Sequence, residues 1–126
     1  MRSRFRIALR ALYEFARYDL IHSTAGFARI YRQLQRQPVA AGSVRAEASA
    51  ICDGVSLAAC FYFRPVPCLQ RSVALTRMLR ERGIAARLVI GYRPAPFFSH
   101  AWVEVEGRVV NDSPGYKMRL KVLTTV

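Results

Sequence analysis

The sequence predicts an α+β fold in which helices come first and a small antiparallel sheet follows. Up to Gly83 the apolar residues recur three or four positions apart, which is the spacing of one helix face. After Gly83 apolar and polar residues alternate, as they do in half-buried strands. Helices grouped ahead of short consecutive strands are typical of α+β domains. We expect a single domain over residues 1–126, with an N-terminal helical segment at 1–43 and a core at 44–126.

Three helical segments are predicted, and glycines and prolines separate them. They cover about residues 3–34, 44–63 and 68–82. The first should break near Gly26, and Ser43 can cap the second. Pro65 and Pro67 end the second helix because proline cannot continue a helix, so the third begins directly at Cys68.

Short strands are predicted after the helices. They cover about residues 86–92, 100–105 and 108–112, with a loop at 94–99 and a further strand at 118–122.

The turn between the second and third strands decides which side chains share a face of the sheet. A two-residue turn of Glu106 and Gly107 would put His100 and Asp112 on opposite faces. A three-residue turn, with Gly107 left-handed as a bulge, would set His100 opposite Asp112, with Cβ atoms about 5 Å apart. Contact between the imidazole and the carboxylate therefore requires the three-residue turn or an equivalent bulge, and we expect a positive φ at Gly107.

Cys68, His100 and Asp112 occur in the order and on the elements that a thiol-based catalytic triad requires. Cys68 opens a helix, and a helix N-terminus favours a thiolate. An imidazole on a strand can take the thiol proton, and a carboxylate on the next strand can hold that imidazole in the right tautomer. Each residue alone has a structural explanation, but the three together predict an enzyme.

The remaining cysteines and histidines argue against a disulfide framework or a metal site. Three cysteines are an odd number, which favours reduced thiols, and Cys52 and Cys60 are expected to be small buried hydrophobic residues. With two histidines and no Cys-x-x-Cys pair, no structural zinc site is expected. No nucleotide-binding motif occurs, so no cofactor is expected, and the need for ATP is left open.

The net charge of +12 comes almost entirely from arginine. Such a field can steer an acidic partner, or the arginines can simply coat a solvated surface. Because they are spread along the chain, with one cluster at the N-terminus, they do not predict a nucleic-acid-binding surface. No apolar run reaches the length of a membrane span, and charges interrupt the apolar N-terminal stretch, so a cytoplasmic protein is expected.

Four short motifs surround the predicted triad. They are Cys68-Leu69-Gln70-Arg71-Ser72-Val73-Ala74-Leu75, Arg80-Glu81-Arg82-Gly83-Ile84-Ala85-Ala86, His100-Ala101-Trp102-Val103-Glu104-Val105 and Asn111-Asp112. Together, over about residues 62–113, they resemble the transglutaminase-like cysteine proteases of lasso-peptide biosynthesis. The resemblance implies a papain/transglutaminase-like core and cleavage of a ribosomal precursor peptide at its leader–core junction.

The resemblance also implies roles and partners. Cys68 would be the nucleophile, His100 the general base and acid, and Asp112 the group that orients His100. Arg71, one turn after Cys68, and Trp102, on the His100 face of its strand, are candidate cleft residues, and a structural role is open for each. The expected partners are the precursor peptide, a separate small leader-binding recognition protein and a cyclase.

Two other functions stay open on the sequence. An acyltransferase of the transglutaminase or arylamine-acetyltransferase kind would use the same triad and resolve the thioester with an amine. A non-catalytic basic binding module would use the arginine field alone, and its Cys68 would be unreactive toward alkylating agents.

Overall fold

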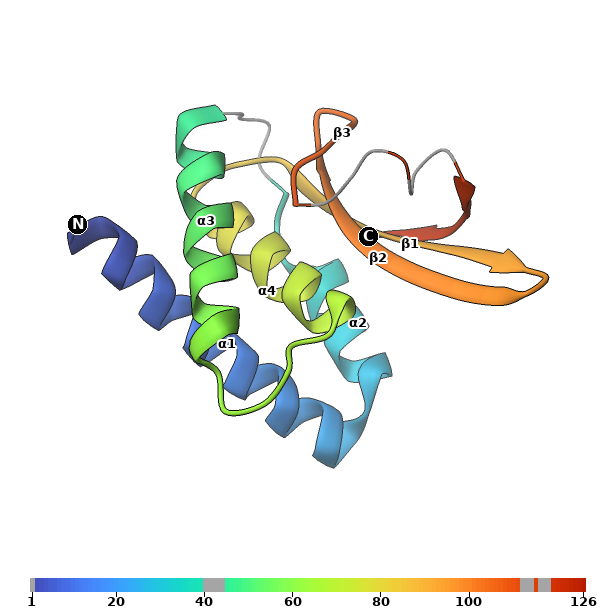
Figure 1. Ribbon diagram of the computed structural model, residues 1–126, viewed down its shortest axis with the longest axis horizontal. Helices are drawn as coiled ribbons and strands as arrows, with labels where there is room; N and C mark the ends of the chain where they lie inside the picture. Colours follow the sequence, from blue (N-terminus) through green and yellow to red (C-terminus); the bar gives the residue numbers. More distant parts are fainter. Residues whose placement is uncertain (1, 40–44, 112–114, 116–118) are drawn as a thin grey trace.

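The computed structural model describes residues 2–39, 45–111, 115 and 119–126, in which four helices precede a four-stranded antiparallel sheet. The helices are α1 (Arg2–Ala25), α2 (Phe27–Arg36), α3 (Arg45–Phe61) and α4 (Cys68–Glu81). The strands are β1 (Ala86–Pro94), β2 (Phe97–Val105), β3 (Arg108–Val109) and β4 (Lys121–Thr125). The helices gather on one side and the sheet curves away from them, which confirms the predicted α+β class (Figure 1).

Glycine and proline end the helices where the sequence predicted. Gly26, with a φ of 77°, separates α1 from α2, and its N–H donates to the carbonyls of Ile21 and His22, at 3.1 Å each. Gly83 has the same φ and follows α4. Few residues other than glycine adopt this conformation, so both positions stop a helix.

α4 lies at the centre of the fold, between the other helices and the sheet (Figure 1). The main core joins α1, α3 and α4 to the helix-facing side of β1 and β2. Its large buried side chains include Phe15, Ile51, Val55, Leu75, Leu79 and Val103. A second cluster joins α2 to α4 and the sheet, and Cys68 packs at its margin. The first turn of α4 is therefore fixed against β2.

The strand order is β3-β2-β1-β4. β1 and β2 pair along their whole length, from Ala86 opposite Val105 to Pro94 opposite Phe97. The predicted loop at 94–99 is therefore wrong except at its two-residue tip. Prolines are tolerated at the end of a hairpin because no backbone N–H is required there for hydrogen bonding to the neighbouring strand.

The last strand is shifted from its predicted place. It covers Lys121–Thr125 rather than 118–122, and it pairs with the edge of β1 that β2 leaves open. Two backbone hydrogen bonds between Leu88 and Val126, of 3.0 and 2.8 Å, fix this end of the chain. Arg80, buried in α4, also donates to the Val126 carbonyl at 2.8 Å. These long-range contacts, rather than a local alternation of apolar and polar residues, determine where the strand lies.

The expected three-residue turn after β2 is wrong. Val105 pairs with Arg108 and Glu104 with Val109, so the turn contains Glu106 and Gly107 alone. Both have positive φ, 54° and 75°, which confirms the prediction for Gly107. Turns with two left-handed residues match the twist of the flanking strands, and this geometry prevails although Glu106 is not glycine.

Candidate active site

Cys68 is the first residue of α4, and its side chain is half-buried. Pro67 precedes it in an extended conformation, with a φ of −63° and a ψ of 160°, and no side chain caps the helix. The Pro67 carbonyl accepts the first helical hydrogen bond, from the Arg71 N–H at 3.0 Å. Cys68 therefore lies at the positive end of the helix dipole, where the amides of the first turn have no helical acceptor.

α1 holds the loop that leads to Cys68. Asp19 accepts hydrogen bonds from the Tyr62 hydroxyl and from Arg64, whose guanidinium it also pairs with. Gln70, buried in the first turn of α4, donates to the Phe15 carbonyl at 3.0 Å. The nucleophile is thus positioned from both sides of the proline bend.

Tyr18 is a further neighbour of Cys68 on α1, and both pack on the second core cluster. Burial raises the pKa of Tyr18, and the negative charges of Asp19 and of a Cys68 thiolate raise that pKa further. The phenol therefore stays neutral beside the sulfur at physiological pH. Helical spacing alone could not distinguish it from an ordinary core residue.

His100 lies on β2, opposite Gly91 of β1. The His100 ring stacks between the rings of Phe98 and Trp102. Its centroid lies 6.2 Å from that of Phe98 and 6.4 Å from that of Trp102. His100 and Cys68 line one pocket of about 220 Å³, together with Val66, Arg71, Ser72, Ala101 and Asn111. The structure therefore brings together the predicted nucleophile and the predicted base, which are 32 positions apart in the sequence.

Asn111 connects the two elements that carry these residues. Its Oδ1 accepts the Val103 N–H of β2 at 2.9 Å, and its Nδ2 donates to Ser72 Oγ of α4 at 3.2 Å. Ser72 Oγ in turn donates to the Ala101 carbonyl at 3.3 Å. Sequence reasoning gave Asn111 no role. The signal that could have found it is Ser72, a polar residue one turn after Cys68 on the same face of a buried helix.

Arg71 also lines the pocket, as predicted for a cleft residue. Its Nε is buried and has no hydrogen-bond partner. None of the described residues that line this pocket carries a carboxylate.

The other two predicted residues have different outcomes. Asp112 lies outside the described residues, so its predicted contact with His100 stays a prediction. Trp102 projects from the same face of β2 as His100, is fully buried with Val89 and Leu120, and its Nε1 donates to Glu104 at 2.8 Å. It stacks against the His100 ring and does not line the pocket.

Gly91 makes room for this Trp102 packing. A Cβ atom at position 91 would lie 2.7 Å from the Trp102 ring and 3.0 Å from Leu120. Because position 91, opposite His100, is a glycine, the indole of Trp102 can stack against the imidazole.

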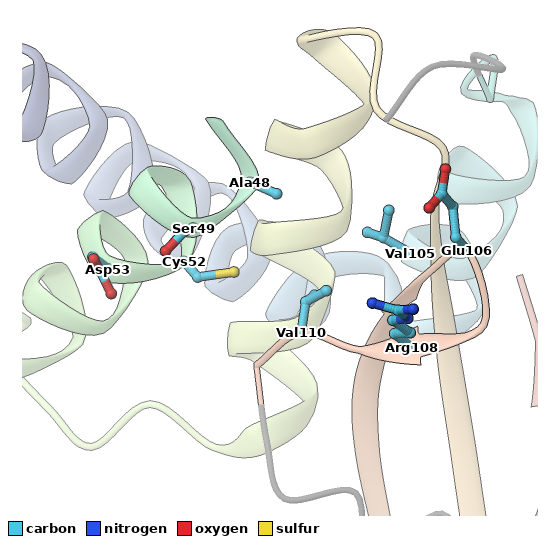
Figure 2. A pocket seen from close by; sticks show the side chains of 8 residues that line it. All are labelled: Ala48, Ser49, Cys52, Asp53, Val105, Glu106, Arg108 and Val110. Carbon is cyan, nitrogen blue, oxygen red and sulfur yellow. The ribbon is translucent and has the colours of Figure 1, made fainter. Parts of the chain in front are cut away.

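A second pocket, of about 270 Å³, lies between α3 and the β2–β3 hairpin (Figure 2). It is lined by Ala48, Ser49, Cys52, Asp53, Val105, Glu106, Arg108 and Val110. Cys52 points into it without an imidazole beside it, and burial raises the pKa of this thiol to about 11 (Figure 2). A thiol that stays protonated is a poor nucleophile, so this pocket lacks the chemistry of the Cys68 pocket.

The remaining thiol corrects a prediction. Cys60 is exposed on α3 rather than buried, whereas Cys52 is half-buried against the main core.

In the part of the chain that the structure describes, no three histidine, cysteine or acidic side chains gather where they could hold a metal ion. Among those same residues, no helix combines the length and the apolar content needed to cross a membrane.

Comparisons with known proteins identify the family of this chain. No solved structure matches the chain significantly. A stretch of 59 residues, 47% of this chain, is 51% identical to the Microcin J25-processing protein McjB of Escherichia coli, and the match spans 28% of that relative's length. The family model described as "Transglutaminase-like superfamily" matches residues 12–125, which include Cys68 and His100. The chain therefore belongs to the transglutaminase-like superfamily.

Proposed function

We propose that this chain is a cysteine peptidase that removes the leader from a ribosomally synthesised lasso-peptide precursor. The observation that carries the proposal is the pocket in which Cys68, at a helix start, meets His100. The similarity to a protein named for processing microcin J25 supports a precursor peptide as the substrate.

The reaction would begin with His100 taking the Cys68 proton. The sulfur then attacks the carbonyl carbon of the last leader residue, and the Cys68 N–H at the helix start donates to the developing oxyanion. As the C–N bond breaks, the imidazolium returns its proton to the leaving amine, which is the new N-terminus of the core peptide. A thioester between Cys68 and the leader remains.

Water would complete the cycle. His100 takes a proton from water, the hydroxide attacks the thioester carbonyl, and the C–S bond breaks to release the leader carboxylate and Cys68. We propose that Asp112 orients His100 and stabilises its charged form, as in other triads. This reaction uses neither a metal ion nor an organic cofactor.

The test is cleavage of a lasso-peptide precursor by this chain, followed by mass spectrometry. Cys68→Ala and His100→Ala should abolish cleavage and keep the fold, and Asp112→Asn should lower kcat by roughly four orders of magnitude if it acts as such an aspartate does elsewhere. Cys60→Ala is the matched control and should retain full activity. Full turnover by Cys68→Ala would end the peptidase proposal.

The same experiment separates hydrolysis from acyl transfer. With water as acceptor the leader is released with a free carboxylate. A leader joined to an added amine, with little free acid, would favour the transglutaminase-type reaction that the superfamily name suggests.

We also propose that a separate leader-binding protein delivers the substrate, and that it docks on the outward side of α1. Four large apolar side chains lie there at helical spacing: Phe5, Leu9, Tyr13 and Leu20, which are 66%, 50%, 57% and 65% exposed. Such a row is how amphipathic helices engage a groove. The N-terminal turns of α1 extend past α3, which leaves this side open (Figure 1).

Charge indicates the kind of partner. Arg6 and Arg17 follow one edge of the apolar row, and the chain carries +12 overall. Two copies of α1 paired antiparallel through the row would bring these arginines against each other, which charge disfavours. An acidic partner surface with an apolar groove fits both features.

A further inference from the structure

The Cys68 pocket contains a guanidinium that no described residue neutralises. Arg71 follows Cys68 by three positions, so both side chains leave the same side of α4. The Arg71 Nε is buried and without an acceptor. Elsewhere the chain pairs such groups: Arg77 bonds Glu14 at 2.9 Å, and Arg80 donates to three backbone carbonyls.

Among the described residues, nothing accepts a hydrogen bond from the Arg71 Nε. Leaving a buried donor unsatisfied costs about 1–3 kcal/mol. Ser72 and Asn111, two other polar residues of the pocket, are engaged in holding α4 to β2. A molecule that enters the pocket can supply the missing oxygen.

The chemistry of Arg71 selects a carboxylate. A guanidinium offers two parallel donors in one plane, which match the two oxygens of a carboxylate. A neutral carbonyl would satisfy one donor and leave the positive charge unbalanced. No carboxylate among the described lining residues competes for the site.

We infer that Arg71 forms a carboxylate-binding subsite beside the Cys68 sulfur. Resting on the proposed function, the carboxylate belongs to an acidic side chain of the precursor at or next to the cleaved bond. Arg71 then acts in substrate selection, because it binds the residue that lies beside the reacting carbonyl.

Two alkylating agents that differ in one group provide the test. In each case the Cys68 sulfur attacks the methylene carbon, an S–C bond forms, the C–I bond breaks, and iodide leaves. Iodoacetate carries a carboxylate on that carbon and iodoacetamide carries a neutral amide. Any effect of Arg71 on the reactivity of the sulfur itself cancels in the ratio of the two rates.

The ratio at Cys68 is compared with the ratio at exposed Cys60 in the same molecule, by mass spectrometry of the labelled peptides. A charge-assisted hydrogen bond should raise the iodoacetate preference at Cys68 roughly tenfold over that at Cys60. Arg71→Gln should remove this excess, and Arg71→Lys, which keeps the charge without the planar fork, should retain part of it.

Arg82→Gln is the matched control, because Arg82 is exposed, lies at the far end of α4 from Cys68 and does not line the pocket. It should leave the iodoacetate preference at Cys68 in place. Equal ratios at Cys68 and Cys60 in the unmodified chain would overturn the subsite, and so would an equal loss in Arg82→Gln and Arg71→Gln. If circular dichroism shows that Arg71→Gln does not fold, the test is the ratio of the two alkylation rates in the unmodified chain and in Arg71→Lys.

Alkylation needs no precursor, so its outcome is independent of the cleavage assay. The subsite can be disproved while the peptidase proposal stands, and the peptidase proposal can be disproved while the subsite stands. Where cleavage is observed, replacing the acidic precursor residue beside the bond by its amide should raise KM for the unmodified chain. The same replacement should change KM little for Arg71→Gln. An equal increase in KM for both would contradict the assignment.

Discussion

Asn111 is the residue that ties the nucleophile's helix to the base's strand. Three hydrogen bonds in a row, from Val103 to Asn111, from Asn111 to Ser72 and from Ser72 to Ala101, cross the space between β2 and α4. Rigid elements position catalytic groups only when something fixes their separation, and shifts of about 1 Å can reduce rates about a hundredfold. We regard Asn111 as a positioning residue, because its two polar atoms are engaged with the protein.

Asn111→Ala should therefore lower both stability and cleavage. Removing the amide leaves the Val103 N–H without its acceptor, and the free energy of unfolding in urea should fall by about 1–3 kcal/mol. The kcat for precursor cleavage should drop, while iodoacetamide still labels Cys68. Asn111→Asp keeps an acceptor for Val103 and should recover most of the stability. Loss of stability without any change in kcat would reduce Asn111 to a structural residue.

At the level of elements, short-range signals located the helices and failed in the sheet. Gly26, Gly83 and the prolines before Cys68 act on their own neighbours, and so they marked the ends of the helices. The position of β4 depends on Val126 pairing with Leu88, which no local pattern encodes. The joint pocket of Cys68 and His100 was predictable because each residue sits at a recognisable point of its own element.

The β2–β3 turn failed for a specific physical reason. Two-residue turns of this kind usually carry asparagine or glycine at the first position, and here Glu106 occupies it with a φ of 54°. The sequence thus offered one glycine where the turn needs two left-handed residues. The predicted pairing of Asp112 with His100 required a longer turn, so the role of Asp112 stays a proposal.

This turn should be improvable by mutation. Glu106→Gly relieves a left-handed conformation that costs a side-chain-bearing residue about 1–2 kcal/mol, so the midpoint of urea unfolding should rise. Gly107→Ala is the converse change and should lower it, because φ is 75° and the site is otherwise open. A lower midpoint for Glu106→Gly would show that contacts of the glutamate side chain outweigh the relief of strain.

At the scale of the whole molecule, the charge and the apolar row on α1 act over different distances. The field of +12 attracts an acidic partner from afar, but at physiological salt it is screened beyond about 8 Å. The row of Phe5, Leu9, Tyr13 and Leu20 acts only at contact, through removal of apolar surface from water. Salt should therefore slow association, and substitutions in the row should speed dissociation.

Both effects can be measured with a candidate leader-binding protein. In a cleavage assay with that protein limiting, the initial rate should fall as salt increases, while single turnover of the preassembled complex changes little. Leu9→Glu should raise the partner concentration needed for half-maximal cleavage roughly tenfold or more, because it places a charge within the proposed contact. Leu57→Glu, at an exposed apolar position on α3, is the matched control and should behave as the unmodified chain does. Without the partner, the basal rates of all three chains should be equal.

Equal partner dependence for Leu9→Glu and Leu57→Glu would remove α1 as the docking face. Binding of the chain to anionic vesicles through α1, without binding to the partner, would assign this row to a membrane surface instead.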